Sequence, residues 1–336
     1  MKPARVEEIF ASARAKRILV IGDLMLDEFV WGKVGRISPE APVPVVEVTS
    51  ENSYPGGAAN VARNLRAFVA QTAVIGLLGT DRGGRELRRL LEDDQIDTSA
   101  AIEDADFPTI VKTRIIARQQ QVVRVDRERI RPPSAAQVAL VVEAVDRQLP
   151  QTDAIILEDY GKGFLGAELV AQISARAQSA GKIVTVDPNP RHLLDWKNVT
   201  AVKPNRSEAF LAAGIPWTDP TEPAQTDKAL LRVGAALLEK WGTRHLLITL
   251  GEQGMMLFDC ADAPHHIPTK ARQVFDVSGA GDTAIAFFTL ALSGGANAVE
   301  AAEIANHASA VVVGKLGTAI VTPEELRASF EDDAGA

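Results

Sequence analysis

Residues 17–23, Arg-Ile-Leu-Val-Ile-Gly-Asp, decide the fold class. After Arg17 the run is apolar and ends in Gly-Asp, which is typical of a buried parallel strand with a polar residue at its carboxyl end. Similar apolar runs follow at residues 72–78, 154–157, 182–187, 201–204 and 245–250. Helical segments are expected between them, at residues 59–68, 85–91, 136–148, 169–180 and 228–241. This alternation predicts an α/β protein with a mostly parallel sheet and helices on both faces.

Two stretches depart from the alternation. Residues 26–49 have no helical period and contain three prolines, which favours extended edge strands. Residues 109–127 alternate apolar residues with Lys, Arg and Gln, as strands with one wet face do. We expect both stretches to pair in a small sheet outside the main one, either as two surface hairpins or as a lid over a site. Residues 1–336 are otherwise expected to form one domain.

The composition excludes several classes of protein. The chain has 336 residues, a formal net charge of −8 and one cysteine, Cys260. An acidic chain has no general basic surface for nucleic acid or for an anionic membrane. A single cysteine excludes an intramolecular disulfide and fits a reducing compartment. Since no segment resembles a signal peptide or a transmembrane span, we expect a cytoplasmic protein.

Residues 275–283, Phe-Asp-Val-Ser-Gly-Ala-Gly-Asp-Thr, precede an apolar segment at 284–292 that predicts a helix. Gly279, Ala280 and Gly281 leave their N–H groups open at its start, where the helix dipole adds positive character, so the turn can hold an anion. Asp282 follows directly, and a base beside an anion site suits phosphoryl transfer to a hydroxyl. A simple helix cap explains the turn equally well when it is taken alone.

Other phosphate-binding motifs fit less well. Residues 279–284 also match G-x-G-x-x-A, but a dinucleotide-binding domain needs a further strand that ends in an acidic residue. Here two alanine-rich helices are expected instead, at residues 284–292 and 299–313. The Walker A sequence and the protein-kinase signatures are absent.

A Gly-Gly turn opens another predicted helix. Gly56 and Gly57 precede an Ala-rich segment with Asn60 in its first turn. The glycines permit either close approach of a ligand or tight helix packing, and the Asn60 amide could bind sugar hydroxyls. Aspartates also recur near the ends of predicted strands, namely Asp23, Asp27, Asp159 and Asp187. Several at one sheet edge would suit hydroxyl recognition and metal binding.

Two more motifs follow predicted strands. Asn205 and Glu208 are spaced for one helix face, where they could hold a Mg²⁺-bound water and a phosphate oxygen, or simply cap the helix. Thr249, Gly251 and Gly254 suit the phosphates or ribose of a nucleotide, with an ordinary turn as the alternative.

Taken together, residues 56–60 and 276–282 resemble the two signatures of the ribokinase-like (pfkB) carbohydrate kinase family. Residues 36–45, 118–126, 159–163 and 311–318 resemble, within it, the D-glycero-β-D-manno-heptose 7-phosphate kinases of lipopolysaccharide and S-layer sugar synthesis. The resemblance runs from about residue 18 to residue 325. In some relatives an adenylyltransferase domain follows the kinase; because this chain stops at Ala336, we expect that activity to be missing.

The resemblance implies a ribokinase-like fold with a small β lid that pairs two subunits into a homodimer. It also implies transfer of a phosphoryl group from ATP, with Mg²⁺, to the anomeric C1 hydroxyl of heptose 7-phosphate, giving the 1,7-bisphosphate. Two rivals remain at this point: a family member for another sugar or sugar phosphate, and a catalytically silent sugar or nucleotide sensor.

The resemblance also implies roles for individual residues. Asp282 would be the catalytic base, and Gly279, Ala280 and Gly281 the anion hole. Nucleotide contacts would come from Asn205, Arg206, Ser207, Glu208, Thr249, Gly251, Gly254 and Asn306. Sugar contacts would come from Asp23, Asp27, Gly56, Gly57 and Asn60. Glu208 and Asp187 would hold Mg²⁺, and Asp276 a monovalent cation such as K⁺.

A sugar phosphate makes one further demand. An acidic protein must gather local positive charge for it, and candidates are Lys33, Arg36, Lys112, Arg114, Arg118 and Lys162. At least half of them are expected to be ordinary exposed strand residues. Relatives commonly have Lys where this chain has Asn189, so Arg191 or Lys162 would have to supply that charge.

Overall fold

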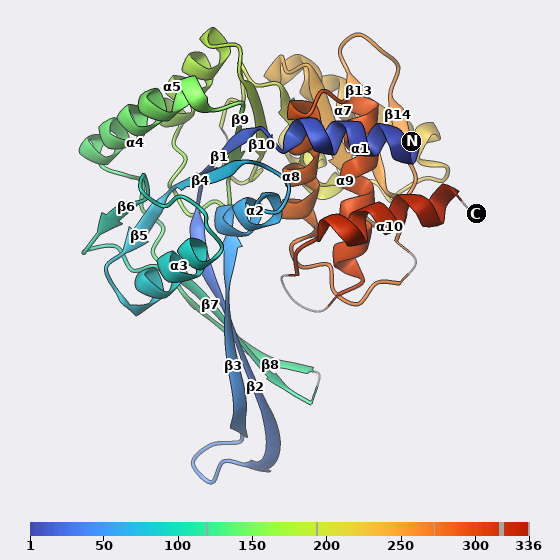
Figure 1. Ribbon diagram of the computed structural model, residues 1–336. Helices are drawn as coiled ribbons and strands as arrows, with labels where there is room; N and C mark the ends of the chain where they lie inside the picture. Colours follow the sequence, from blue (N-terminus) through green and yellow to red (C-terminus); the bar gives the residue numbers. More distant parts are fainter. Residues whose placement is uncertain (119, 193, 272, 316–318, 335–336) are drawn as a thin grey trace.

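An eight-stranded sheet forms the centre of the computed structural model, which describes residues 1–118, 120–192, 194–271, 273–315 and 319–334 (Figure 1). Its strand order is β14-β13-β12-β11-β10-β9-β1-β4. The six strands from β12 to β4 are parallel, whereas β13 pairs antiparallel with both of its neighbours. The bounds are β1 (Arg17–Gly22), β4 (Gln71–Ile75), β9 (Ala154–Glu158), β10 (Ile183–Asp187), β11 (Ala201–Val202), β12 (His245–Thr249), β13 (Met255–Asp259) and β14 (His265–Ile267).

Helices cover both faces of this sheet, as the sequence predicts. Along β1, Ile18 and Val20 enter one apolar core and Leu19 and Ile21 the other, because side chains alternate across a strand. The first core contains α1 (Pro3–Ala13), α2 (Ala58–Leu65), α3 (Arg82–Asp93), α8 (Ala280–Ser293), α9 (Ala298–Val313) and α10 (Pro323–Ala334). The second contains α4 (Ala135–Gln148), α5 (Ala167–Ser179), α6 (Arg206–Ala213) and α7 (Lys228–Trp241). Within the described ranges, no helix has both the length and the apolar character needed to cross a bilayer.

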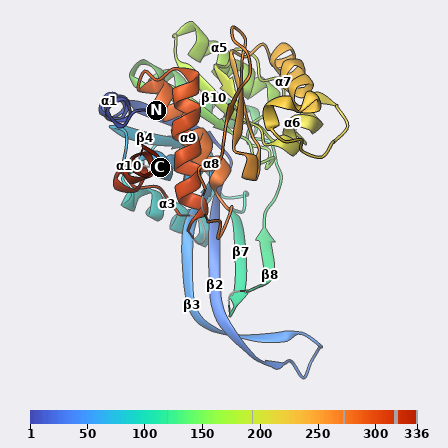
Figure 2. The same cartoon turned by 90° about the vertical axis from the view of Figure 1, so that its right-hand side faces the viewer.

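A second sheet projects from the main body. Its order is β3-β2-β7-β8, with bounds β2 (Leu24–Ile37), β3 (Pro44–Gly57), β7 (Ile110–Ala117) and β8 (Gln120–Arg127). Figure 2 shows β2 and β3 extending well away from the central sheet. The pairing of the two predicted extended stretches is therefore confirmed. Both β2 and β3 reach beyond residues 26–49, and only Asp23 separates β2 from β1. We call this four-stranded sheet the lid.

One predicted strand is divided. Residues 72–78 were expected to form a single strand, but the chain changes direction at Gly76 and continues as β5 (Leu77–Gly79), which pairs with β6 (Ile102–Asp104). A Cβ atom at Gly76 would lie 2.5 Å from Cγ of Leu24. The close approach of the two chain segments at this point therefore requires glycine.

Candidate active site

Asp282 lies in the first turn of α8 and is only 5% exposed. Its carboxylate accepts two hydrogen bonds of 2.6 Å, from Nδ2 of Asn60 at Oδ2 and from the hydroxyl of Tyr160 at Oδ1. Gly279, the N-cap of α8, has a φ of +79°, a conformation that favours glycine. A Cβ atom there would also lie 3.1 Å from Nδ2 of Asn60. The turn thus aims the carboxylate and leaves room for the side chain that holds it.

The surroundings tune Asp282 for proton transfer. Burial raises the pKa of Asp282 to about 6, while the hydrogen bonds from Asn60 and Tyr160 partly oppose the rise. Burial and the nearby Asp282 hold the pKa of Tyr160 well above its usual value, so its hydroxyl remains a donor. A carboxylate with a pKa just below neutrality is ionised at pH 7 and is a stronger base than an ordinary aspartate.

Three carboxylates meet at this point. Glu158 ends β9 and Asp187 ends β10, and one oxygen of each lies within 4.8 Å of the other and of an Asp282 oxygen. Lys203 Nζ, just beyond β11, lies 2.9 Å from Oδ2 of Asp187 and is buried. Burial alone would lower the pKa of Lys203, but the adjacent carboxylates raise it, so the ammonium stays charged. The carboxyl ends of parallel strands are where ligands of such sheets gather.

Two neighbouring cavities lie at the N-terminus of α8, and the larger one contains this cluster. The larger, of about 600 Å³, is lined by Glu158, Asp187, Lys203, Glu208 and Asp282 among others. The smaller, of about 440 Å³, has mostly apolar walls that include Met255, Val274, Ala310 and Val313. Both include Thr249, Gly251, Val277 and Gly281 in their lining, so an apolar compartment joins a charged one at the N-terminus of α8.

This arrangement fits the groups that the sequence predicts. A nucleotide base suits the apolar compartment, and its phosphates would then meet the N–H groups of Gly279 and Gly281. The N–H of Ala280, which the sequence predicts to be open as well, instead donates a 3.2 Å hydrogen bond to the carbonyl of Val277. Asp187 and Glu208 both line the larger cavity and offer the hard oxygen ligands that Mg²⁺ prefers.

The predicted nucleotide residues form two groups, one beside the smaller cavity and one at residues 205–208. Thr249, Gly251, Gly254 and Asn306 all line the smaller cavity, and their contact with a nucleotide stays a prediction. Asn306 donates a 2.6 Å hydrogen bond to the carbonyl of Pro268, which fixes its amide.

The motif at residues 205–208 is first of all a helix cap. Asn205 is the N-cap of α6 and exchanges hydrogen bonds of 2.7 and 2.9 Å with Glu208, while Ser207 donates to Asn205 Oδ1. Arg206 also lines the larger cavity, but it forms a buried ion pair of 2.7 Å with Asp227, so its charge is already compensated within the protein. The structure shows the helix cap, and because Asn205 and Glu208 also line the larger cavity, their role at Mg²⁺ and phosphate stays a prediction.

Asp23 differs from its predicted role in sugar binding. It is 2% exposed and accepts backbone hydrogen bonds of 3.0, 3.0 and 3.2 Å from Tyr160, Lys162 and Phe164. Since three donors already surround the carboxylate, Asp23 organises the loop that carries Tyr160 instead of facing a sugar. The three donors follow β9, and the sequence does not show that β9 is a neighbour of β1 in the sheet.

Asp27, Gly56 and Arg114 form one group at the base of the lid. Arg114 makes an ion pair with Asp27, and a Cβ atom on Gly56 would lie only 2.2 Å from Oδ2 of Asp27. Gly57 has a φ of +58° and is the N-cap of α2, which carries Asn60. Asn60 is 1% exposed and its Oδ1 has no hydrogen-bond partner, so it can accept one from a ligand hydroxyl.

The predicted cations lie at different distances from this group. Lys112 is half-buried, with Nζ 5.3 Å from the centre of the Tyr160 ring, and Lys162 pairs with Glu128 at 2.8 Å. Arg36 is nine residues beyond Asp27 along β2, which at the usual rise is about 30 Å. Arg118 is exposed at the outer turn between β7 and β8. Within one chain, Arg36 and Arg118 are therefore outside the site.

Asp276 accepts a 2.9 Å hydrogen bond from the backbone N–H of Ser278 and stabilises the turn before α8. Its predicted role as a monovalent-cation ligand stays a prediction.

Three residues of the cluster have no role in the sequence-based prediction: Glu158, Tyr160 and Lys203. Glu158 and Tyr160 lie beside and within the motif at residues 159–163, and Lys203 lies in the predicted strand at residues 201–204. They come together only because β9, β10 and β11 are neighbours in the sheet. The positive charge that relatives commonly carry at the position of Asn189 was expected from Arg191 or Lys162. The cation beside the carboxylates is Lys203, whereas Lys162 pairs with Glu128 and Arg191 is exposed.

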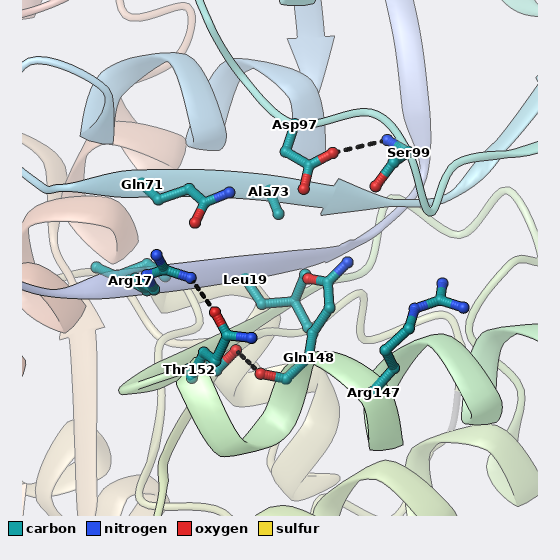
Figure 3. Close-up of a pocket in the computed structure, with 11 residues that line it drawn as sticks. Arg17, Leu19, Gln71, Ala73, Asp97, Ser99, Arg147, Gln148 and Thr152 are labelled. Atoms are coloured by element: carbon teal, nitrogen blue, oxygen red, sulfur yellow. Dashed lines mark hydrogen bonds between the residues drawn. The ribbon is translucent and has the colours of Figure 1, made fainter.

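Another cavity lies at the opposite end of the strands. Figure 3 shows side chains from the start of β1 and β4, among them Arg17 and Gln71, with Arg147 and Gln148 of α4 nearby. The cavity measures about 210 Å³, and Arg17 is already hydrogen-bonded to Gln151. Its single acid, Asp97, bonds to the N–H of Ser99. This cavity lacks the base and anion turn found at Asp282.

Comparison with known proteins agrees with this geometry. A family model described as pfkB family carbohydrate kinase matches residues 15–325. The bifunctional protein HldE of Desulfatibacillum aliphaticivorans is 42% identical over 316 residues, which are 94% of this chain and 63% of that relative. This chain spans 63 to 66% of the lengths of curated relatives that it matches, just under two thirds.

Solved structures share the fold at low sequence identity. Ribokinase of Arabidopsis thaliana, solved with ribose and ATP, has a TM-score of 0.71 at 19% identity and covers 94% of this chain and 99% of its own. Phosphofructokinase-2 of Escherichia coli, solved with potassium, has a TM-score of 0.75 at 18% identity, with 95% and 99% covered.

Proposed function

The chain belongs to the pfkB family of carbohydrate kinases, and we propose that its acceptor is D-glycero-β-D-manno-heptose 7-phosphate, phosphorylated at the C1 hydroxyl. The general activity, ATP-dependent phosphorylation of a sugar, follows from the family. The choice of acceptor is supported by the motifs at residues 36–45, 118–126 and 159–163 and by the 42% identity with a bifunctional protein HldE. The observation that carries the mechanism is the buried Asp282, held by Asn60 and Tyr160 beside the anion turn.

The reaction is one in-line displacement. Asp282 accepts the proton of the sugar hydroxyl as its oxygen bonds to the γ-phosphorus of ATP. The bond from the γ-phosphorus to the bridging oxygen breaks, and ADP leaves with that electron pair. The N–H groups of Gly279 and Gly281 and the Lys203 ammonium stabilise the negative charge of the transferred group. When bound, Mg²⁺ would be held by Asp187 and Glu208 and would neutralise phosphate charge.

The sugar would lie between the lid and α2. Asn60 Oδ1, which has no hydrogen-bond partner, would accept a hydrogen bond from one sugar hydroxyl, and Asp27, held by Arg114, would accept another. The remote phosphate would meet Lys112, the half-buried cation over Tyr160, with Arg114 and Lys162 close by. Lys112 is the best placed of these because burial lowers its pKa, and an anionic ligand would compensate for that desolvation.

An ADP-release assay across acceptors tests the proposal. Heptose 7-phosphate should give the highest kcat/KM, above ribose and fructose 6-phosphate, and the product should carry phosphate at C1 by ³¹P and ¹³C NMR. A higher kcat/KM for another sugar would replace the acceptor and leave the kinase assignment intact. ATP binding without ADP release for any acceptor would favour the sensor.

Two further features are proposed with this function. The lid would pair with the lid of a second chain, since it exposes Val48, Val123 and Val125 at 50%, 45% and 41%. Arg36 or Arg118 could then reach the partner's site. Light scattering should report a dimer, and Val48→Lys with Val123→Lys should yield monomers.

K⁺ beside Asp276 would raise the rate of phosphoryl transfer, and a comparison of the rates in K⁺ and in tetramethylammonium tests this.

A further inference from the structure

Glu158 has an environment that the phosphoryl-transfer mechanism does not explain. It ends β9, is 1% exposed, and its Oε2 has no hydrogen-bond partner. A buried carboxylate oxygen without a partner is costly unless it is protonated or meets a cation. The carboxylates of Asp187 and Asp282 each place an oxygen within 4.8 Å of Glu158.

The local charge is not balanced by protein groups. Three carboxylates face one ammonium, that of Lys203, which leaves a formal charge of −2 when all are ionised. Lys203 and Arg206 are the only lysine or arginine among the described residues that line the larger cavity, and Arg206 is paired with Asp227. The group therefore has the charge and the ligand atoms for one hard divalent cation.

We propose that Glu158, Asp187 and Asp282 bind one divalent cation of the Mg²⁺ or Mn²⁺ class in the absence of nucleotide. Octahedral Mg²⁺ sets its ligand oxygens about 3–4 Å apart, so the three oxygens need only small side-chain adjustments to surround an ion. Waters would complete the coordination from the cavity. This site shares Asp187 with the Asp187–Glu208 pair expected to serve the metal of ATP, and it differs from that pair in its defining ligand, Glu158.

Binding is tested with the nucleotide-free full chain and Mn²⁺ alone, followed by electron paramagnetic resonance of free Mn²⁺. The wild-type protein should bind one Mn²⁺ that Mg²⁺ displaces. Glu158→Gln keeps the shape and removes one ligand, so it should weaken Mn²⁺ binding about tenfold or more. Asp159→Asn is the matched control: Asp159 is the next residue and lines the same cavity, but it bonds to His192 and to the N–H of Gly161.

Three results would overturn the proposal. One is the absence of a single Mn²⁺ site in the wild-type protein, which needs no variant to fold. Another is equal Mn²⁺ affinity in the wild-type protein and in a Glu158→Gln variant with unchanged melting temperature. Equal weakening by Asp159→Asn would likewise remove the assignment to these three ligands.

A kinetic consequence rests on the proposed function. A cation on Asp282 blocks proton acceptance, so free Mg²⁺ in excess of ATP should inhibit the wild-type kinase and inhibit Glu158→Gln less. Mn²⁺ binding without such inhibition would support the cation site and count against Asp282 as the base. Inhibition without nucleotide-free Mn²⁺ binding would overturn the site and leave the base role standing.

Discussion

Asn60 Nδ2 lies 2.6 Å from Oδ2 of Asp282, although 222 positions separate the two residues in the chain. The bond joins the Gly-Gly turn before α2 to the anion turn before α8, and both helices pack in the same core. The two motifs are thus parts of one site, in which the first orients the base that the second supplies.

Loss of the base should nearly abolish turnover. Asp282→Asn keeps an acceptor oxygen for the Tyr160 hydroxyl but cannot accept a proton, so kcat should fall by about 10²–10⁴-fold. ATP affinity, measured by calorimetry, should be retained because the apolar compartment is unchanged. Asp262→Asn, in an exposed loop, is the control and should not alter kcat. Turnover near the wild-type value in Asp282→Asn would remove the assigned role.

The pH dependence should report Asp282. Its pKa is about 6 and only the ionised form accepts a proton, so kcat/KM should fall as the pH decreases through 6. Tyr160→Phe removes a hydrogen bond that stabilises the ionised form, which raises the pKa of Asp282 and moves this acidic limb to higher pH. A limb that stays in place in Tyr160→Phe would show that another group controls it.

Lys203 should matter for stability as well as for rate. Lys203→Met leaves the carboxylates at Asp187 and Glu158 without their ammonium, and breaking such a buried pair lowers the free energy of unfolding by about 3–5 kcal/mol. Lys197→Met breaks an ion pair of similar length, 2.8 Å to Asp195, but at the surface, so its effect should be about 0–1 kcal/mol. Urea unfolding compares the two variants. Equal effects would mean that Lys203 does not compensate the carboxylates.

The fit of Gly56 against Asp27 should govern sugar affinity. In Gly56→Ala the new methyl would lie 2.2 Å from Oδ2 of Asp27, so Asp27 must move and its ion pair with Arg114 must adjust. We expect KM for the sugar to rise with KM for ATP unchanged, and the free energy of unfolding to fall by about 1–3 kcal/mol. Gly35→Ala is the control, since no atom lies within 4 Å of its Cβ position. An unchanged sugar KM in Gly56→Ala would exclude Asp27 from the sugar site.

The sequence predicts those parts of the site that depend on local structure. The turn at Gly279–Asp282 and the helix that follows could be predicted because small residues before an apolar run specify a helix start. The alternation of strands and helices likewise predicted the sheet and its two covered faces. Residues 206–213, by contrast, were only implied as a helix by the spacing of Asn205 and Glu208.

The remainder depends on pairing between distant strands. Glu158, Tyr160 and Lys203 could not be assigned because their proximity follows from the order of β9, β10 and β11 in the sheet. Asp23 looked like a sugar ligand because its backbone partners lie about 140 positions later in the chain. Arg36 looked like a phosphate ligand because a sequence does not reveal how far a hairpin carries its tip from the body.

The parallel pairing of β2 with β7 also bears on how the molecule assembles. The first residue pair of these two strands is Met25 with Ile110. The intervening residues 26–109 must therefore close into a loop before this pair can form. β2 and β3, by contrast, are joined by a short connection, so they can pair into a hairpin without closing a long loop. We therefore expect β3 amides to gain protection from hydrogen exchange before those of β7 during refolding. The base of the lid, where Arg114 of β7 meets Asp27 of β2, would then be completed only after the β2–β3 hairpin has formed.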